Sequence, residues 1–271
     1  MPYCTFCLNR ITWNHFFTVN IFKMNPDFIL PKPPLKGIGR ILESQTRKAL
    51  LEFKMLKGAK KLGLALSGGK DSIGLLFLLN AILGRGFPPL DLVAIHIKGP
   101  FSCGANVSES FLQSVCDQLS VPLIIKTCDD LPQESDCYSC SRRRRSLIFQ
   151  AAKEAGCKRI AFGHHEDDLA QTLLLNLFQK GHIEGLLPKI KMVKYGVTII
   201  RPLIYIQERQ LITFAKLHGF LRLSCQCPVG QTSMRKKMAS LLAEVEADFP
   251  SATKNCARAA LKFGTKKAAT P

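Results

Sequence analysis

The chain has 271 residues, 46% hydrophobic and 21% charged, a balance typical of a globular protein rather than a disordered one. Lys and Arg number 38 against 20 acidic residues, and the resulting net charge of +18 favours a polyanionic partner such as nucleic acid. Because no apolar run approaches the roughly 18 residues of a membrane span and no signal-peptide pattern opens the chain, we expect a soluble, cytoplasmic protein without membrane contact.

The N-terminal 35 residues lack a regular pattern. The proline-rich stretch 30–37 that ends them is typical of a linker or an extended arm. Met24 is an alternative start, which would place 1–23 outside the natural protein, and N-terminal sequencing of native material would decide this. A basic helix is then predicted over 41–59.

Beyond this helix, short apolar runs alternate with helical patterns. Strands are predicted over 61–66, 91–97, 122–128, 157–163 and 197–203. Helices are predicted over 72–84, 107–119, 141–156, 166–179, 207–219 and 232–247. This alternation predicts an α/β domain over 36–250, with a parallel sheet, helices on both faces and helical extensions at the two ends. Residues 251–271 are expected to form a basic tail.

The segment SGGKDS follows the first predicted strand, where the strand enters a helix. It supplies two glycines, two hydroxyls, an ammonium group and a carboxylate, on Ser67, Gly68, Gly69, Lys70, Asp71 and Ser72. At the carboxyl edge of a parallel sheet, inward backbone N–H groups and a helix N-terminus can hold an anion. The glycine pair alone would justify only a tight turn. The carboxylate is more telling, because beside phosphates it would be repulsive unless Mg²⁺ bridged them.

This loop resembles the Ser-Gly-Gly-x-Asp-Ser loop of the ATP pyrophosphatase superfamily, and all six positions match. The resemblance implies an ATP site, adenylate transfer with release of pyrophosphate, and Mg²⁺ held by Asp71 at the β- and γ-phosphates. It also implies that the second strand lies against the adenosine. His96 in that strand, otherwise a core residue, and Gly163 after the fourth strand are therefore candidate nucleotide contacts.

A longer stretch, 137–178, resembles the bacterial tRNA 2-thiocytidine synthetases over nearly its whole length. The segments LLPKIKM, VTIIRPLIYI and CQCPVGQ follow in that family's order, so the resemblance covers about 36–250. These enzymes replace an oxygen of an anticodon-loop cytidine with sulfur. The resemblance implies tRNA as a partner, a sulfur donor such as a cysteine desulfurase, and a homodimer as the usual assembly.

Cys137 and Cys140 form a C-x-x-C pair, the spacing common to zinc and iron–sulfur sites, although two unrelated thiols before a helix would look the same. The resemblance implies a [4Fe-4S] cluster with Cys227 as its third ligand and Cys225 as the alternative. Three protein ligands leave one iron without a thiolate. By analogy with open positions on catalytic zinc, that iron could bind sulfide.

Charged residues near the predicted carboxyl edge are candidate tRNA contacts. Asp167 and Asp168 open a helix, where acids often only stabilise the helix N-terminus, but here they could orient Mg²⁺ or a basic group. Four consecutive arginines cannot all face one way on a helix, so about two of them are expected to contact phosphate. The candidates are Arg142, Arg143, Arg144, Arg145, His164, Asp167, Asp168, Lys189 and Arg201.

We therefore predict an ATP-, Mg²⁺- and iron–sulfur-dependent sulfurtransferase acting on tRNA cytidine 32. Its catalytic residues would be Asp71, Cys137, Cys140 and Cys227. Three alternatives remain: a thiolase, for example one that forms 2-thiouridine, with persulfide chemistry and no cluster; a tRNA lysidine synthetase, whose lysine nucleophile needs no cysteine; and an inactive module that binds tRNA by charge alone.

Overall fold

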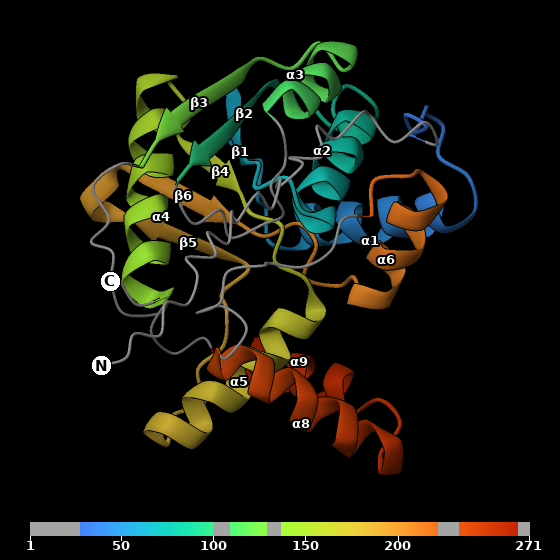
Figure 1. Ribbon diagram of the computed structural model, residues 1–271, viewed down its shortest axis with the longest axis vertical. Coiled ribbons are helices and arrows are strands. Elements are labelled where there is room, and N and C mark those ends of the chain that lie inside the picture. The colour runs from blue at the N-terminus through green and yellow to red at the C-terminus, as the bar shows by residue number, and fades with distance from the viewer. Residues whose placement is uncertain (1–27, 100–108, 129–136, 222–232, 265–271) are drawn as a thin grey trace, which may run out of the picture.

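The computed structural model describes residues 28–99, 109–128, 137–221 and 233–264 (Figure 1). Within these ranges six strands form one sheet in the order β3-β2-β1-β4-β6-β5. The strands are β1 Lys61–Ala65, β2 Asp91–Lys98, β3 Leu123–Thr127, β4 Arg159–Ala161, β5 Lys189–Met192 and β6 Val197–Ile200. The helices are α1 Gly37–Glu52, α2 Lys70–Ile82, α3 Glu109–Gln118, α4 Cys137–Glu154, α5 Glu166–Lys180, α6 Glu208–Leu217, α8 Met234–Asp248 and α9 Ala252–Phe263.

The predicted α/β fold is confirmed, with one addition at the edge of the sheet. Neighbouring strands from β3 to β6 pair in parallel, whereas β5 pairs antiparallel with β6. Strand β5 was not predicted, because its four residues, KIKM, alternate charged and apolar side chains over too short a length to stand out. The sheet is therefore mixed rather than wholly parallel.

Both faces of the sheet are buried, which explains why its central strands read as continuous apolar runs. On β1, Leu62 and Leu64 face a core shared with α1, α2, α3 and α6. Ala65 faces the opposite side, where Phe149 of α4 packs. Alternate residues of one strand thus serve two separate cores, as the two-residue repeat of a strand requires.

The chain reverses its direction of winding at the centre of the sheet. From β1 it proceeds to β2 and β3 on one side, and β4 and β6 then pair on the other side of β1. In open α/β sheets ligands bind beyond the carboxyl ends of strands at such a reversal. The segments that leave β1 and β4 are therefore the expected walls of a site.

Helix α5 extends from the sheet into a group of helices that also contains α8 and α9, drawn in yellow to red at the bottom of Figure 1. Residues 251–271 were predicted to form a basic tail outside the domain. The first part of this segment is instead a helix, α9, over Ala252–Phe263. Its Ala257 and Ala260 are buried and belong to the main core, together with Leu242 of α8. Apolar spacing on the basic helix accounts for this packing.

Two other expectations need correction or a limit. The helix after the C-x-x-C pair was predicted to begin at 141, but α4 already begins at Cys137. Helix α1 begins at Gly37 and ends at Glu52, earlier than the predicted 41–59. Most of the predicted arm, 1–27, lies outside the described residues. No helix of the described chain is long and apolar enough to span a bilayer.

Candidate active site

The loop between β1 and α2 is held in shape by its own serines. Gly68 has a φ of +86°, a conformation that glycine adopts without strain. The hydroxyl of Ser72 accepts a hydrogen bond from the Gly68 N–H at 3.1 Å and donates to the Gly69 carbonyl at 3.0 Å. Its oxygen also lies 3.0 Å from that of Ser67. The loop therefore leads directly into the first turn of α2, whose N–H groups have no partners inside the helix.

The segment after β4 packs against this first turn at a glycine. A Cβ atom on Gly163 would lie 3.0 Å from the carbonyl carbon of Asp71 and 3.2 Å from the backbone nitrogen of Ser72. Only a residue without a side chain permits so close an approach. Gly163, predicted as a nucleotide contact, thus brings β4 and the loop between β1 and α2 together, and it also lines the adjoining pocket.

A pocket of about 310 Å³ opens at this junction, between the carboxyl ends of β1, β2 and β4 and the first turns of α4. Its functional side chains come from the loop, the start of α5 and the start of α4: Ser67, Asp71, Ser72, His164, Asp168, Cys140, Arg144 and Arg145. The structure therefore places the SGGKDS loop between β1 and α2 and a cysteine of the C-x-x-C pair on one cavity.

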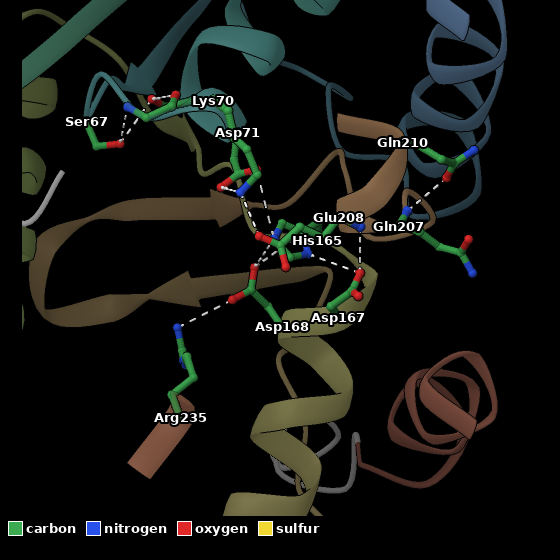
Figure 2. A network of polar contacts seen from close by, with 12 residues as sticks. Ser67, Lys70, Asp71, His165, Asp167, Asp168, Gln207, Glu208, Gln210 and Arg235 are labelled. Atoms are coloured by element: carbon green, nitrogen blue, oxygen red, sulfur yellow. Dashed lines mark hydrogen bonds and ion pairs between the residues drawn. The ribbon is translucent and has the colours of Figure 1, made fainter. Parts of the chain in front are cut away.

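A network of charged groups joins the loop to α5 and α6 (Figure 2). The Lys70 ammonium lies 2.7 Å from a carboxylate oxygen of Glu208 and 3.2 Å from Oδ1 of Asp71. Burial lowers the pKa of Lys70, but these two carboxylates outweigh it and raise the pKa. Asp167 accepts a hydrogen bond from the Glu208 N–H at 2.7 Å. Lys70 is thus a paired cation, and it is not among the residues that line the pocket.

His165 lies at the centre of this network. Its Nε2 is 3.5 Å from Oδ2 of Asp168 and 4.0 Å from Oδ1 of Asp71, and its Nδ1 is 3.4 Å from Oδ2 of Asp167. Burial lowers the pKa of His165, but the three carboxylates together raise it to about 9. The imidazolium therefore balances part of the negative charge gathered at the rim of the sheet.

The neighbouring His164 has the opposite character. The Nε of buried Arg201 donates to its Nδ1 at 3.3 Å, so Nδ1 must be an acceptor and the ring must carry its proton on Nε2. Burial and the Arg201 cation lower the pKa of His164 to about 3. A second guanidinium nitrogen of Arg201 donates to the Leu187 carbonyl. His164, which lines the pocket, is therefore a neutral hydrogen-bond donor rather than a base.

Two carboxylates in the pocket differ in how far their charge is compensated. Oδ1 of Asp71 is buried without a hydrogen-bond partner among the described residues, and burial raises the pKa of this group despite His165 and Lys70. Burial also opposes ionisation of Asp168. There, however, the His165 cation, with smaller contributions from other neighbours, lowers the pKa to about 2. Asp71 is therefore the less compensated of the two carboxylates, although Lys70 and His165 both lie near it.

Other predicted residues lie apart from the pocket. Nδ1 of buried His96 lies 2.8 Å from the Leu66 carbonyl, and His96 does not line the cavity. Lys189 donates to the Lys54 carbonyl. Arg142 and Arg143 are exposed on α4 outside the cavity lining.

Only some of the cysteines predicted as cluster ligands lie in the part of the chain that the structure describes. Cys137 is the first residue of α4, three positions before Cys140, whose exposed fraction is 7%. Cys225 and Cys227 lie outside the described residues. The ligand set as a whole therefore stays a prediction.

Sequence reasoning missed Glu208, which pairs with Lys70, and Arg235 of α8, whose guanidinium lies 3.5 Å from Asp168. Glu208 opens a predicted helix, where an acid has an ordinary structural explanation. Arg235 belongs to a basic run whose members look alike in the sequence. Neither carries a local signal, because each acquires its partner from a segment far away along the chain.

Comparison with known proteins identifies the family to which the site belongs. A family model described as a PP-loop domain matches residues 41–221. A tRNA-cytidine(32) 2-sulfurtransferase of Geobacter metallireducens is 33% identical over 228 residues, which are 81% of this chain and 88% of the relative. The chain belongs to this family. The predicted membership of the 2-thiocytidine synthetases, within the PP-loop superfamily, is confirmed.

The chain is also similar to a second sulfurtransferase and to a tRNA thiolase of known structure. The Geobacter sulfurreducens tRNA-cytidine(32) 2-sulfurtransferase is 31% identical over 229 residues, covering 80% of this chain and 88% of the relative. The structure of the U34-tRNA thiolase NcsA from Methanococcus maripaludis, solved with its [4Fe-4S] cluster, superposes with a TM-score of 0.68 at 23% identity. That match covers 82% of this chain and 77% of the thiolase, and it shows a shared fold.

Proposed function

We propose that this protein is an ATP-dependent tRNA sulfurtransferase that converts cytidine 32 of the anticodon loop to 2-thiocytidine. One observation supports this most directly: the phosphate loop and Cys140 line the same pocket. A nucleotide-activating loop and a sulfur-handling residue must share a cavity if one base is to be activated and then thiolated. The proposal also includes a cytoplasmic location, a cysteine desulfurase or similar sulfur donor, and a homodimer.

The loop fits ATP together with a magnesium ion. The first turn of α2 directs backbone N–H groups at a bound pyrophosphate. The buried Oδ1 of Asp71 lies near Lys70 but has no hydrogen-bond partner among the described residues, and it is a suitable ligand for a hard cation. Among the described residues no three His, Cys, Asp or Glu side chains are grouped to hold a metal ion. Mg²⁺ would therefore be held by Asp71 together with phosphate oxygens and water, as is usual at nucleotide sites.

The α4 end of the pocket fits a cysteine-ligated cluster. Cys140 is buried at the pocket wall, one helical turn beyond Cys137 along α4. With Cys227 these residues would hold a [4Fe-4S] cluster, which when bound supplies activated sulfide beside the target base. Arg144, whose guanidinium donates to the carbonyl of Ile97 at 3.1 Å, places a fixed cation next to this wall.

The residues of the chain then have distinct parts in the reaction. The C2 oxygen of cytidine attacks the α-phosphate and pyrophosphate leaves, so that the oxygen can later depart with AMP when sulfur replaces it. The α2 N-terminus stabilises the departing pyrophosphate, and the Nε2–H of His164 can donate to an oxygen that gains charge. Because His164 holds its proton at a fixed atom, it orients and stabilises without removing a proton.

The basic wall of the pocket supports an RNA substrate. Arg144 and Arg145 both line it and come from the same helix as the cysteines. A single-stranded anticodon loop allows the target base to unstack at low cost and enter a pocket of this size. The arginines would then contact the phosphates that flank the base.

Mass spectrometry of tRNA nucleosides tests the proposal. Cells that lack the gene should lose 2-thiocytidine, and the wild-type gene should restore it. Asp71→Asn and Cys140→Ser should each fail to restore it, because they remove the magnesium ligand and the cysteine at the pocket wall. Lys153→Ala, an exposed change at the far end of α4, is the matched control and should restore it fully.

Each alternative gives a different result in the same experiment. Loss of 2-thiouridine or of lysidine, with 2-thiocytidine unchanged, would move the protein to another activity. Restoration by Asp71→Asn would indicate a binding module without catalysis. A colourless protein that is active after anaerobic purification would contradict the cluster.

A further inference from the structure

A second cavity, of about 1010 Å³, lies between α1 and α9. Its walls come from both helices, and Tyr205, in the segment between β6 and α6, also lines it. We infer that this groove binds the phosphate backbone of tRNA at a distance from the reacting base. The inference rests on the proposed function, which supplies tRNA as the ligand.

The groove carries unbalanced positive charge. Lys48 of α1 and Lys254, Arg258 and Lys262 of α9 line it and are all exposed. Among the described residues none of these four side chains forms an ion pair. Two acids on the same walls, Glu52 and Glu166, offset only part of this charge. Glu52 accepts a hydrogen bond from the Tyr205 hydroxyl at 2.7 Å, and Glu166 is only 7% exposed. Such cations are available to a polyanion.

Aromatic rings accompany two of these cations. The ammonium of Lys48 is 4.7 Å from the centre of the Tyr205 ring, and that of Lys262 is 5.0 Å from the Phe263 ring. The Phe263 side chain is 53% exposed. A groove that combines several cations with aromatic rings, one of them exposed, is an arrangement that binds RNA strands, whose phosphates pair with the cations while bases or riboses contact the rings.

The groove is distinct from the catalytic pocket. Asp168 lines the pocket, whereas Glu166 lines the groove, and residues two apart on a helix point about 200° apart. The two cavities therefore lie on opposite sides of the start of α5. A tRNA whose cytidine enters the pocket would meet the groove with another part of its backbone. An RNA strand is a better partner for this groove than a protein, because its phosphates present several closely spaced negative charges to the four cations.

The salt dependence of tRNA binding tests this inference. The double variant Lys254→Ala/Arg258→Ala removes two cations one helical turn apart on α9. For the full-length holoprotein and unmodified tRNA, the plot of log affinity against log salt should lose about two units of slope, and affinity should fall about tenfold at physiological salt. Phe263→Ala should weaken binding without changing the slope, because a ring carries no charge. ATP affinity should stay unchanged in all variants.

The control is Lys153→Ala/Lys158→Ala, which removes two exposed cations at the amino-terminal edge of the sheet and should change neither quantity. Equal slopes for the wild type and the α9 double variant would overturn the inference. A change in molar mass by light scattering would overturn it too, since the groove would then be a protein interface. If the wild type itself neither bound nor thiolated tRNA, the proposed function would fail instead, so the two failures are distinguishable.

Discussion

At the scale of single residues, His165 couples the charge of the site to the stability of the fold. Its pKa is raised to about 9 because the carboxylates of Asp168, Asp167 and Asp71 outweigh its burial. A folded-state pKa above the unfolded value of about 6.5 stabilises the protein fully below pH 6.5. That stabilisation is lost as the pH rises through 9.

We therefore expect the metal-free wild type to lose free energy of unfolding between pH 6.5 and 9.5 relative to His165→Gln. The relative loss should be about 1–3 kcal/mol. Urea unfolding of both proteins across this range measures it, and the comparison cancels the titration of other groups. Parallel pH curves for the two proteins would show that His165 is not charged in the folded state.

Arg201 fixes the tautomer of His164, and this can be tested by choosing what replaces it. Arg201→Met removes the donor to Nδ1, so the pKa of His164 should rise from about 3 toward its ordinary value and its proton should no longer be confined to Nε2. Arg201→Gln keeps an N–H donor and should preserve the tautomer. Nitrogen NMR of the labelled histidines distinguishes these states.

When the thiolation activity of the same two variants is measured, it should fall more in Arg201→Met than in Arg201→Gln. Both variants lose the bond from Arg201 to the Leu187 carbonyl, so both should be destabilised by about 1–3 kcal/mol. Equal activities of the two variants would mean that the tautomer of His164 is irrelevant to the reaction.

At this scale the sequence could group those candidate residues that share one short segment. The SGGKDS segment holds its serines and Asp71 close together, and the structure places Ser67, Asp71 and Ser72 on one pocket. The sequence could not show that Lys70 would be paired with Glu208, 138 positions away along the chain. Such a partner depends on how α6 packs beside α2, which the order of residues does not state.

At the scale of elements, the contact between β4 and α2 depends on Gly163. Gly163→Ala would place a methyl group 3.0 Å from the Asp71 backbone, and neither backbone can move without disturbing the loop. We expect a loss of about 1–3 kcal/mol in stability and a marked fall in ATP affinity. Calorimetric titration of ATP and thermal unfolding measure the two effects.

Gly156→Ala is the matched control for this change. Gly156 has a φ of +76°, but a Cβ there would have no neighbour within 4 Å. It should therefore lose about 1 kcal/mol through backbone strain while binding ATP normally. Equal effects of the two variants on ATP binding would contradict the role of close approach at Gly163.

The order and type of the main elements could be predicted because buried strands and amphipathic helices have distinct spacings. The errors occur where that signal is weak. The first two turns of α4 carry cysteines, serines and arginines and few apolar residues, so the helix was predicted to start late. β5 is too short to show a period, and α9 was taken for a tail because its charges conceal buried residues such as Ala257.

At the scale of the whole molecule, the core crosses from the sheet into the helical group. Leu169 and Leu173 of α5 belong to the same buried cluster as the strands, and so do Leu242 of α8 and Ala260 of α9. The start of α5 also carries the charged groups of the pocket. The helical group therefore supports the active site instead of forming a separate appendage.

This continuity predicts that the described parts of the protein unfold together. Leu242→Ala should lower the stability of the whole chain by about 2–5 kcal/mol, because it leaves a cavity in a core that both parts share. Calorimetry should show one transition moved to lower temperature. Val245→Ala, at a position that is 38% exposed on the same helix, is the control and should move it much less. An early transition confined to α8 and α9 in hydrogen exchange, with the sheet unaffected, would instead show two independent units, because a shared core cannot lose one half while the other keeps its full stability.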